Sequence, residues 1–281
     1  MLNVPERYLE EAAPVIVTSP TTRCGTTLVQ RLLSASDNAF LYGEEVGKHI
    51  VTLTQSLIVV MRHIEQNGAS LDGHLAHALS GAMDDWQPGL MAPSTVMLRG
   101  WIETYYQLPM VLADYGRSIG RPIWGFKWPA APREVIRALM MLMPRAKVIY
   151  VCRNPFDALK SAKARKFVRT DQETDRFCAA WAKNMQEVAA LEQDERVLLV
   201  RYEDMVKNSA DCADLLELFT GVENADRSVF DIKVNTFLGE AALGYSPSRY
   251  IEPEILTDAD RKTVLAKAGA VIGRYFPEIP L

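Results

Sequence analysis

The chain lacks several features that would assign it to a class at once. Its four cysteines among 281 residues form no C-x-x-C pair, which predicts neither a redox motif nor a cysteine-based metal site. No apolar run approaches the roughly 18 residues of a membrane-spanning helix, and the acidic N-terminal segment contains no apolar h-region. The net charge of −4 argues against a general nucleic-acid-binding surface. We therefore expect a soluble protein with no nucleic-acid partner and no integral membrane segment.

Histidine is also scarce, with four residues in all. His74 and His77 form an H-x-x-H pair, but no Asp or Cys completes a ligand set around them, and one face of a helix explains them better. We predict no metal site. The cysteines are widely spaced, and Cys24 and Cys152 lie inside the binding motifs described below, where a disulfide would be disruptive. All four are interpreted as reduced thiols, which indicates a cytoplasmic protein.

No internal repeat or low-complexity segment divides the chain, so we predict one domain over residues 1–281. Buried strands are predicted at Pro14–Thr18, Pro122–Lys127, Lys147–Cys152 and Arg196–Arg201. They alternate with helices, which indicates an α/β fold with a mainly parallel sheet flanked by helices. About a hundred residues separate the first two strands, too many for a plain crossover. This insertion is predicted to be mostly helical, with helices at Val46–Gln66, Leu71–Met83 and Ile102–Ile119.

The first predicted strand leads into the most informative segment, residues 15–33. An apolar run ends at Ser19-Pro20, a short polar loop follows, and an amphipathic helix pattern begins at its end. A strand, loop and helix in this order direct free backbone N–H groups and the positive end of the helix dipole at one point. Gly25 allows the backbone to approach a ligand, and Arg23 adds a positive charge. The segment therefore predicts a binding site for a phosphate-like anion.

The nucleotide-binding motif G-x-x-x-x-G-K-[ST] is absent from this loop. With Gly25 as the second Gly of the motif, its Lys position is Thr26, so the Lys that holds the phosphates of ATP or GTP is missing. Thr26 and Thr27 add hydroxyl donors instead. The loop therefore suits an anion that is handled without Mg²⁺.

A second segment predicts a second phosphate subsite. Arg153 follows the strand at 147–152, at the carboxyl end where ligands bind in open α/β sheets. Pro155 suits the first turn of a helix, and Ser161 lies about two turns along it. An Arg and a Ser in these positions could close on a phosphate. The alternative is a capped helix with a solvated basic face made of Lys160, Lys163, Arg165 and Lys166.

Together these segments resemble the sulfotransferase family, whose donor is 3′-phosphoadenosine 5′-phosphosulfate (PAPS). The family's [KR]-x-G-T-[TS] loop binds the 5′-phosphosulfate, and the residues that match it are Arg23, Cys24, Gly25, Thr26 and Thr27. Its R-[ND]-P-x-D-x-x-x-S segment binds the 3′-phosphate, which assigns Arg153 and Ser161 to that subsite. The segment RYEDMV resembles the family's RYEDL, whose tyrosine contacts the adenine, and that role falls on Tyr202.

The resemblance also implies the catalytic groups. Lys127 matches a lysine that bridges donor and acceptor, and Arg23 is a second cation near the leaving oxygen. Many family members carry Lys-x-His at this point, but Trp and Pro follow Lys127, so that histidine base is absent. The tyrosylprotein sulfotransferases use a glutamate in a Gly-Glu-Glu segment instead, and Glu45 takes the position of that base. The alternative is that Glu44 and Glu45 are both acids of a helix N-terminus.

Two further regions follow from the resemblance. Family members close a C-terminal loop over the nucleotide with a Lys or Arg, which matches Arg249, and Phe237 could flank the adenine. The helical insertion, about residues 40–120, is expected to form a cap over the acceptor pocket. Its apolar and aromatic content favours a small or lipid-like hydroxyl acceptor over a polyanionic glycan.

The sequence thus predicts a PAPS-dependent O-sulfotransferase that releases adenosine 3′,5′-bisphosphate (PAP) and uses no metal. An NTP-dependent kinase or ATPase with a variant phosphate loop is one alternative, which a magnesium requirement would favour. A non-catalytic nucleotide-binding protein is the other, which donor binding without turnover would favour. The acceptor and the oligomeric state, a homo-oligomer included, are left open.

Overall fold

The computed structural model describes residues 4–82, 86, 88–236 and 250–280. Its strands are β1 (Val15–Thr18), β2 (Ala39–Tyr42), β3 (Ile123–Lys127), β4 (Lys147–Cys152) and β5 (Val197–Arg201). Its helices are α1 (Glu6–Glu11), α2 (Thr26–Ser34), α3 (Glu44–Leu79), α4 (Ser94–Ser118), α5 (Arg133–Leu142), α6 (Pro155–Ala164), α7 (Asp171–Val188), α8 (Tyr202–Lys207), α9 (Ser209–Thr220) and α10 (Asp258–Tyr275), with a 3₁₀ turn, η1 (Arg227–Asp231), before the last of them.

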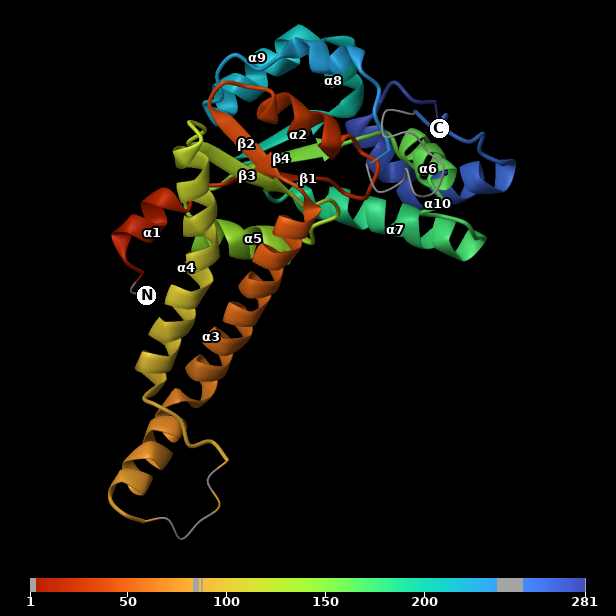
Figure 1. Cartoon of the computed structure of the whole chain (residues 1–281). Helices are drawn as coiled ribbons and strands as arrows, with labels where there is room; N and C mark the ends of the chain where they lie inside the picture. The colour runs from red at the N-terminus through yellow and green to blue at the C-terminus, as the bar shows by residue number, and fades with distance from the viewer. Residues whose placement is uncertain (1–3, 83–85, 87, 237–249, 281) are drawn as a thin grey trace.

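The strands form one sheet in the order β2-β3-β1-β4-β5, and every neighbouring pair is parallel (Figure 1). β1 lies at the centre, with β3 and β2 on one side and β4 and β5 on the other. The register pairs Val17 with Lys127 and Cys152 with Arg201. Because parallel strands end at the same edge, the segments that follow β1, β3, β4 and β5 meet at the carboxyl edge of the sheet, where ligands bind in such folds.

The predicted α/β fold is confirmed, and the four predicted strands are present with their starts shifted by at most one residue. Strand β2 is an addition to the prediction, because its run AFLY is too short to be distinguished from a loop by sequence pattern alone. The break predicted between helices 46–66 and 71–83 is wrong, since α3 is continuous across it. Asp72 lies at that point and accepts hydrogen bonds from the N–H and the hydroxyl of Ser94, at 2.7 and 2.8 Å, which caps the start of α4.

Helices α3 and α4 pair along their length to form what we call the arm, which extends away from the sheet (Figure 1). The end near the sheet is tied to it, since the Tyr42 hydroxyl of β2 donates to the Leu112 carbonyl at 3.2 Å. Further out, the Thr54 hydroxyl donates to the Tyr105 hydroxyl at 3.3 Å. The arm makes up most of the predicted insertion, whose first residues belong to β2. Its role as a cap over an acceptor stays a prediction.

Apolar side chains fill both faces of the sheet, as expected for parallel strands. Val15 and Val17 belong to one core, which α2 and α9 complete, whereas Ile16 belongs to the other, which α5 and α7 complete. Figure 1 shows α2, α8 and α9 on one side of the sheet and α5 and α7 on the other. Helices therefore cover both faces of the sheet, and the carboxyl edge of the strands is where the candidate site lies.

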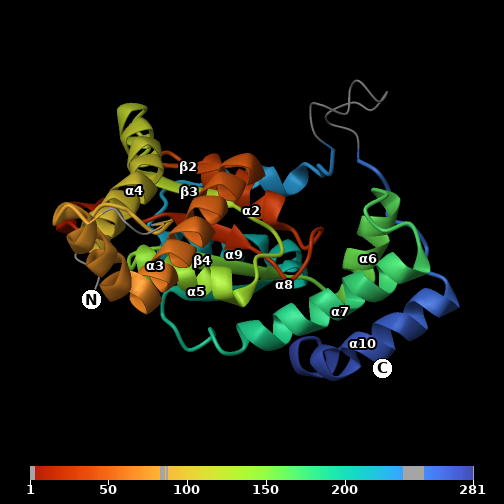
Figure 2. The ribbon, with the colours of Figure 1, turned by 90° about the horizontal axis from the view of Figure 1, so that it is seen from below.

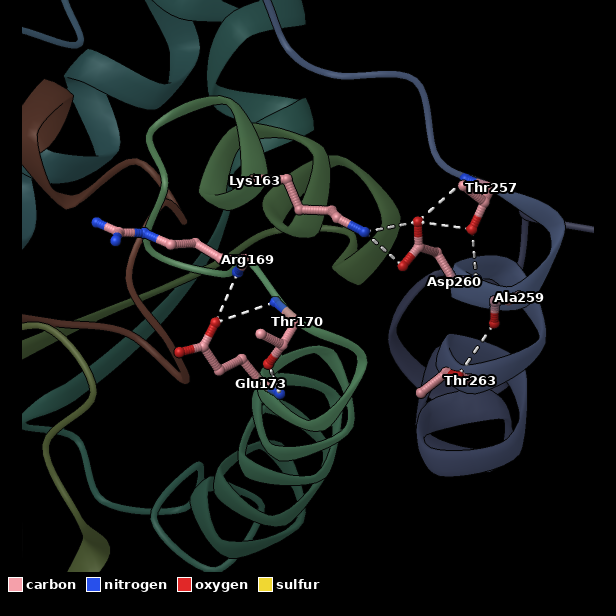
Figure 3. A network of polar contacts seen from close by, with 8 residues as sticks. All are labelled: Lys163, Arg169, Thr170, Glu173, Thr257, Ala259, Asp260 and Thr263. Atoms are coloured by element: carbon pink, nitrogen blue, oxygen red, sulfur yellow. Dashed lines mark hydrogen bonds and ion pairs between the residues drawn. The ribbon is translucent and has the colours of Figure 1, made fainter.

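Helix α10 lies beside α7 and also reaches α6 (Figure 2). Lys163 of α6 donates to both carboxylate oxygens of Asp260 in α10, at 2.7 and 2.8 Å (Figure 3). Asp260 is 3% exposed and forms a capping box with Thr257 at the start of α10. Burial acts to raise the pKa of Asp260, but the bonds from Lys163 and Thr257 outweigh it and hold the pKa below its ordinary value. The pair therefore fixes α10 to the helix that carries Ser161.

Substitution of this buried carboxylate should be costly. We expect Asp260→Asn to lower the free energy of unfolding by about 3 kcal/mol, because it leaves Lys163 without its counter-charge. Lys160→Met, which breaks a partly exposed pair with Asp157 on the same helix, should lower it by less than about 0.5 kcal/mol. Because the folded pKa of Asp260 is depressed, its contribution is present above about pH 4 and is lost as the pH falls through the folded pKa. Urea unfolding of the wild type and both variants at neutral and acidic pH measures this, and equal losses for the two variants would contradict it.

Three structural findings bear on the chemistry that the sequence left open. Within the described ranges, no helix has the length and apolarity needed to cross a membrane. All four cysteines are free and buried, which agrees with their interpretation as reduced thiols, and burial raises the pKa of each thiol. In the same part of the chain, no group of three or more His, Cys, Asp or Glu side chains could hold a metal ion.

Candidate active site

The loop between β1 and α2 has a strained backbone that brings it against α8. Gly25 caps α2 with a φ of 102°, and Arg23 has a φ of 71°, in the left-handed region that few residues other than glycine adopt. A Cβ atom on Gly25 would overlap the ring of Tyr202, which follows β5 directly. Gly25 is therefore required twice, for its backbone conformation and for the close approach of Tyr202.

Gly25→Ala should accordingly damage the loop. We expect a loss of about 1–3 kcal/mol in the free energy of unfolding, because the methyl group meets both the left-handed strain and the Tyr202 ring. Gly43→Ala is the matched control. Gly43 has a φ of −78° and no neighbour within 4 Å of an added Cβ atom, so this variant should lose no more than about 0.5–1 kcal/mol, the cost of Ala at a helix N-cap. Thermal or urea unfolding measures both, and a Gly25→Ala variant as stable as Gly43→Ala would contradict the packing.

The two predicted phosphate-binding segments meet in a cluster of guanidinium groups. Arg23 Nε donates to Ser161 Oγ at 3.2 Å, and Arg153 Nη1 donates to the Arg23 carbonyl at 3.3 Å. The Arg153 guanidinium lies 4.4 Å from the centre of the Tyr202 ring. Burial, followed by the charges of Arg165 and Arg153, lowers the pKa of Arg23. The cluster thus concentrates positive charge, with the Nε of Arg153 buried and without a hydrogen-bond partner in the part of the chain that the structure describes.

Arg165 is a member of this cluster that the sequence reading missed. Its charge, like that of Arg153, lowers the pKa of Arg23, whereas the sequence offered Arg165 only in the alternative of a capped helix with a solvated basic face. It lies one helical turn after Ser161, and residues four apart share a helix face, which is the signal that could have found it. Such a group of cations fits a phosphate, which forms charge-assisted and bidentate bonds with Arg.

Lys127 connects the loop after β1 with the start of the arm. It is 8% exposed, and its Nζ lies 3.0 Å from the hydroxyl of Thr27 and 3.0 Å from Glu44 Oε1. Helix α3 can come this close because Gly47 packs on the Lys127 backbone, where a Cβ atom would lie 2.7 Å from the carbonyl oxygen. A cation, a hydroxyl group and a carboxylate therefore meet at the end of β3.

The remaining predicted site residues have different outcomes. Glu45 lies next to Glu44 in the first turn of α3 and is exposed, so its role as the base stays a prediction. Tyr202 packs between the loop and Arg153, and its contact with adenine also stays a prediction. Cys24 is buried in the loop, and Thr26 is buried in the first turn of α2. Arg249 and Phe237 lie outside the described residues.

Comparison with protein families identifies the class. A family model described as the sulfotransferase family matches residues 14–226 of the chain, a span that includes both predicted phosphate-binding segments, Lys127 and Tyr202. The chain therefore belongs to the sulfotransferase family, the PAPS-dependent enzymes of sulfuryl transfer that its motifs resemble. A comparison with curated proteins found no match.

Several solved structures are similar to this one. The sulfotransferase domain from the curacin biosynthetic pathway is 16% identical with a TM-score of 0.51, and the match covers 90% of this chain and 97% of that one. A sulfotransferase from Alicyclobacillus acidocaldarius is 13% identical, with a TM-score of 0.47 and 95% of each chain covered. A mouse sulfotransferase complexed with PAP is 13% identical, with a TM-score of 0.45 and coverages of 97% and 85%. The first similarity supports the fold.

Proposed function

We propose that the protein transfers the sulfuryl group of PAPS to the hydroxyl group of a small or lipid-like acceptor and releases PAP. The observation that carries the proposal is the contact of Lys127 with both Thr27 and Glu44. It joins a cation, a residue of the anion-binding loop and a carboxylate at one strand end. Transfer to a hydroxyl group needs charge stabilisation on the leaving side and a base on the accepting side, and this arrangement offers both.

The anionic groups of the donor would be divided between two sets of residues. The loop after β1, together with Lys127, would hold the 5′-phosphosulfate at the N-terminus of α2. Arg153 and Ser161 would hold the 3′-phosphate, with Arg165 as a third partner. Arg23 belongs to the loop but bonds to Ser161, so it would link the two subsites. No residue set for a metal ion is needed for this scheme.

In the proposed reaction, the acceptor oxygen attacks the sulfur in line with the bond to the 5′-phosphate oxygen. A new S–O bond forms while that bond breaks, and negative charge grows on the oxygen that leaves with PAP. Lys127 would stabilise this charge, and Glu44 would take the proton of the acceptor hydroxyl. Glu45, which the resemblance implies as the base, is the alternative carboxylate one position further along the turn.

The arm favours an apolar acceptor. An open cavity of about 290 Å³ in its outer half is lined by Val59, Val60, His63, Ile64, Met91, Met97 and Trp101. Along α3, Val59 lies about 22 Å from Glu44 at 1.5 Å per residue. A long-chain alcohol could thus place its hydroxyl group near Glu44 while its tail reaches toward the cavity. A series of alcohols of increasing chain length would test this preference.

Calorimetric titration with PAP and with ATP, each with and without Mg²⁺, tests the donor. We expect PAP to bind without magnesium, because the site offers cations and loop N–H groups but no Lys of the ATP-binding motif. Incubation with radiolabelled PAPS and the alcohol series then tests transfer. Binding of ATP that requires magnesium would overturn the proposal in favour of a kinase or ATPase, and PAP binding without transfer to any hydroxyl would indicate a non-catalytic protein.

A further inference from the structure

One peptide group at the carboxyl edge of the sheet is held by side chains at both of its polar atoms. The group joins Arg153 to Asn154. Its carbonyl oxygen accepts a hydrogen bond from Trp181 Nε1 of α7 at 3.0 Å, and its N–H donates to Glu203 Oε1 of α8 at 2.9 Å. Because the peptide group is planar, these two hydrogen bonds together hold the orientation of the whole group. They therefore also hold the backbone of Arg153 at the end of β4.

Asn154, whose N–H bonds to Glu203, is also the N-cap residue of α6. The Asn154 side chain accepts from the Phe156 N–H at 2.9 Å and caps the helix, with Pro155 as its first residue. The register of β4 with β5 pairs Cys152 with Arg201, which brings the residues after β5 beside those after β4. Glu203 is thus the side chain that connects the end of β5 to the junction between Arg153 and the helix that carries Ser161.

Glu203 lowers the stability of the fold, which a residue with a purely structural role would not be expected to do. Its second oxygen, Oε2, is buried and has no hydrogen-bond partner among the described residues. Burial raises the pKa of Glu203, although the bond from Asn154 and the charges of Arg153 and Arg201 oppose the shift. A buried carboxylate that is only partly paired destabilises the fold. The predicted contact of Tyr202 with the adenine does not require an acidic side chain at the next position, so Glu203 needs an explanation of its own.

We propose that Glu203 is a positioning residue of the 3′-phosphate subsite, which acts by accepting the Asn154 N–H and thereby aiming Arg153. It contacts no ligand itself. The proposal rests on the proposed function, because it takes PAP as the ligand of the site. It predicts that loss of this hydrogen bond weakens the binding of nucleotides that carry a 3′-phosphate, and leaves the binding of those without it nearly unchanged.

Three variants separate the hydrogen bond from the charge. Glu203→Gln keeps an acceptor oxygen and removes the charge, Glu203→Asp keeps the charge and withdraws the acceptor by one methylene group, and Glu203→Ala removes both. The probes are PAP and adenosine 5′-phosphate, measured by calorimetry. Asp204→Asn is the matched control, since Asp204 is an exposed acid on the same helix that pairs with Arg201 at 3.6 Å. Thermal melting of each protein checks that it is folded.

We expect Glu203→Ala and Glu203→Asp to weaken PAP binding at least about tenfold, with adenosine 5′-phosphate changed less than about twofold. Glu203→Gln and Asp204→Asn should stay within about threefold for both ligands. The proposal is overturned if every Glu203 variant keeps the wild-type preference for PAP, if PAP and adenosine 5′-phosphate weaken equally, or if Glu203→Gln fails as Glu203→Ala does. A wild-type protein without preference for PAP would instead contradict the proposed function.

Discussion

Replacement of Arg153 by Ala is expected to weaken PAP binding about 100- to 1,000-fold. The Arg153 guanidinium stacks on Tyr202, and its Nη1 bonds to the Arg23 carbonyl. Its Nε, by contrast, is buried and has no hydrogen-bond partner in the described residues. An ordered cation with unused donors is what a phosphate group needs for charge-assisted, bidentate bonding. Calorimetric titration with PAP measures the loss.

The same substitution should spare stability. Arg153 and Arg165 both lower the pKa of Arg23, which means that the guanidinium groups repel one another when no anion is bound. Arg153→Ala removes part of that repulsion, which offsets the lost contacts of Arg153 with Tyr202 and with the Arg23 carbonyl, and should change the melting temperature by only a few degrees. Arg153→Lys keeps the charge without the planar fork and should show an intermediate loss, about tenfold. Lys160→Met removes a charge on α6, the helix that follows Arg153, and should bind PAP as the wild type does. If Arg153→Ala binds PAP normally, the 3′-phosphate subsite lies elsewhere.

The meeting of the two predicted phosphate-binding segments at one edge of the sheet is the part of the candidate site that follows most directly from the sequence. Its signals are local: a buried strand, a turn at Ser19-Pro20 and a helix in one case, and Arg153, Pro155 and Ser161 around a helix start in the other. Each signal lies within a few residues, and the carboxyl ends of parallel strands bring them to one edge without further information. The structure adds the direct contact of Arg23 with Ser161, which joins the two segments.

Contacts between segments far apart in the chain could not be predicted from the sequence. The pairing of Lys127 with Glu44 depends on how closely Gly47 lets α3 approach the end of β3, and no local pattern encodes that distance. A resemblance between Gly-Glu-Glu segments cannot show which of two adjacent acids faces Lys127. Neighbouring residues on a helix point about 100° apart, so only one of the two can do so. The contact of Glu203 could not be predicted for the same reason, because its partner Asn154 follows β4 whereas Glu203 follows β5.

Glu44→Gln should lower kcat by about 10²- to 10⁴-fold and leave PAP affinity within about threefold. Glu44 is the carboxylate that contacts Lys127, at 3.0 Å. In the proposed reaction it takes the proton of the acceptor hydroxyl while Lys127 stabilises the leaving oxygen. The guanidinium cluster is held by contacts of Arg23 with Ser161 and of Arg153 with the Arg23 carbonyl, which do not involve Glu44, so the donor should still bind. The assay is transfer from radiolabelled PAPS to the best alcohol of the chain-length series, with initial rates measured at saturating donor.

Glu45→Gln, measured in the same assay as Glu44→Gln, decides which of the two adjacent acids is the base. If Glu44 is the base, kcat falls in Glu44→Gln, and added formate restores part of the activity of Glu44→Ala, because a small carboxylate can occupy the space of the lost side chain. A Glu45 variant that loses activity and is rescued by formate, with Glu44→Gln active, would return the role to the residue that the resemblance implies. Lys48→Ala, an exposed change one turn further along α3, should keep the wild-type rate. Rescue distinguishes a missing base from a displaced Lys127, since formate supplies a proton acceptor but cannot rebuild the position of the lysine.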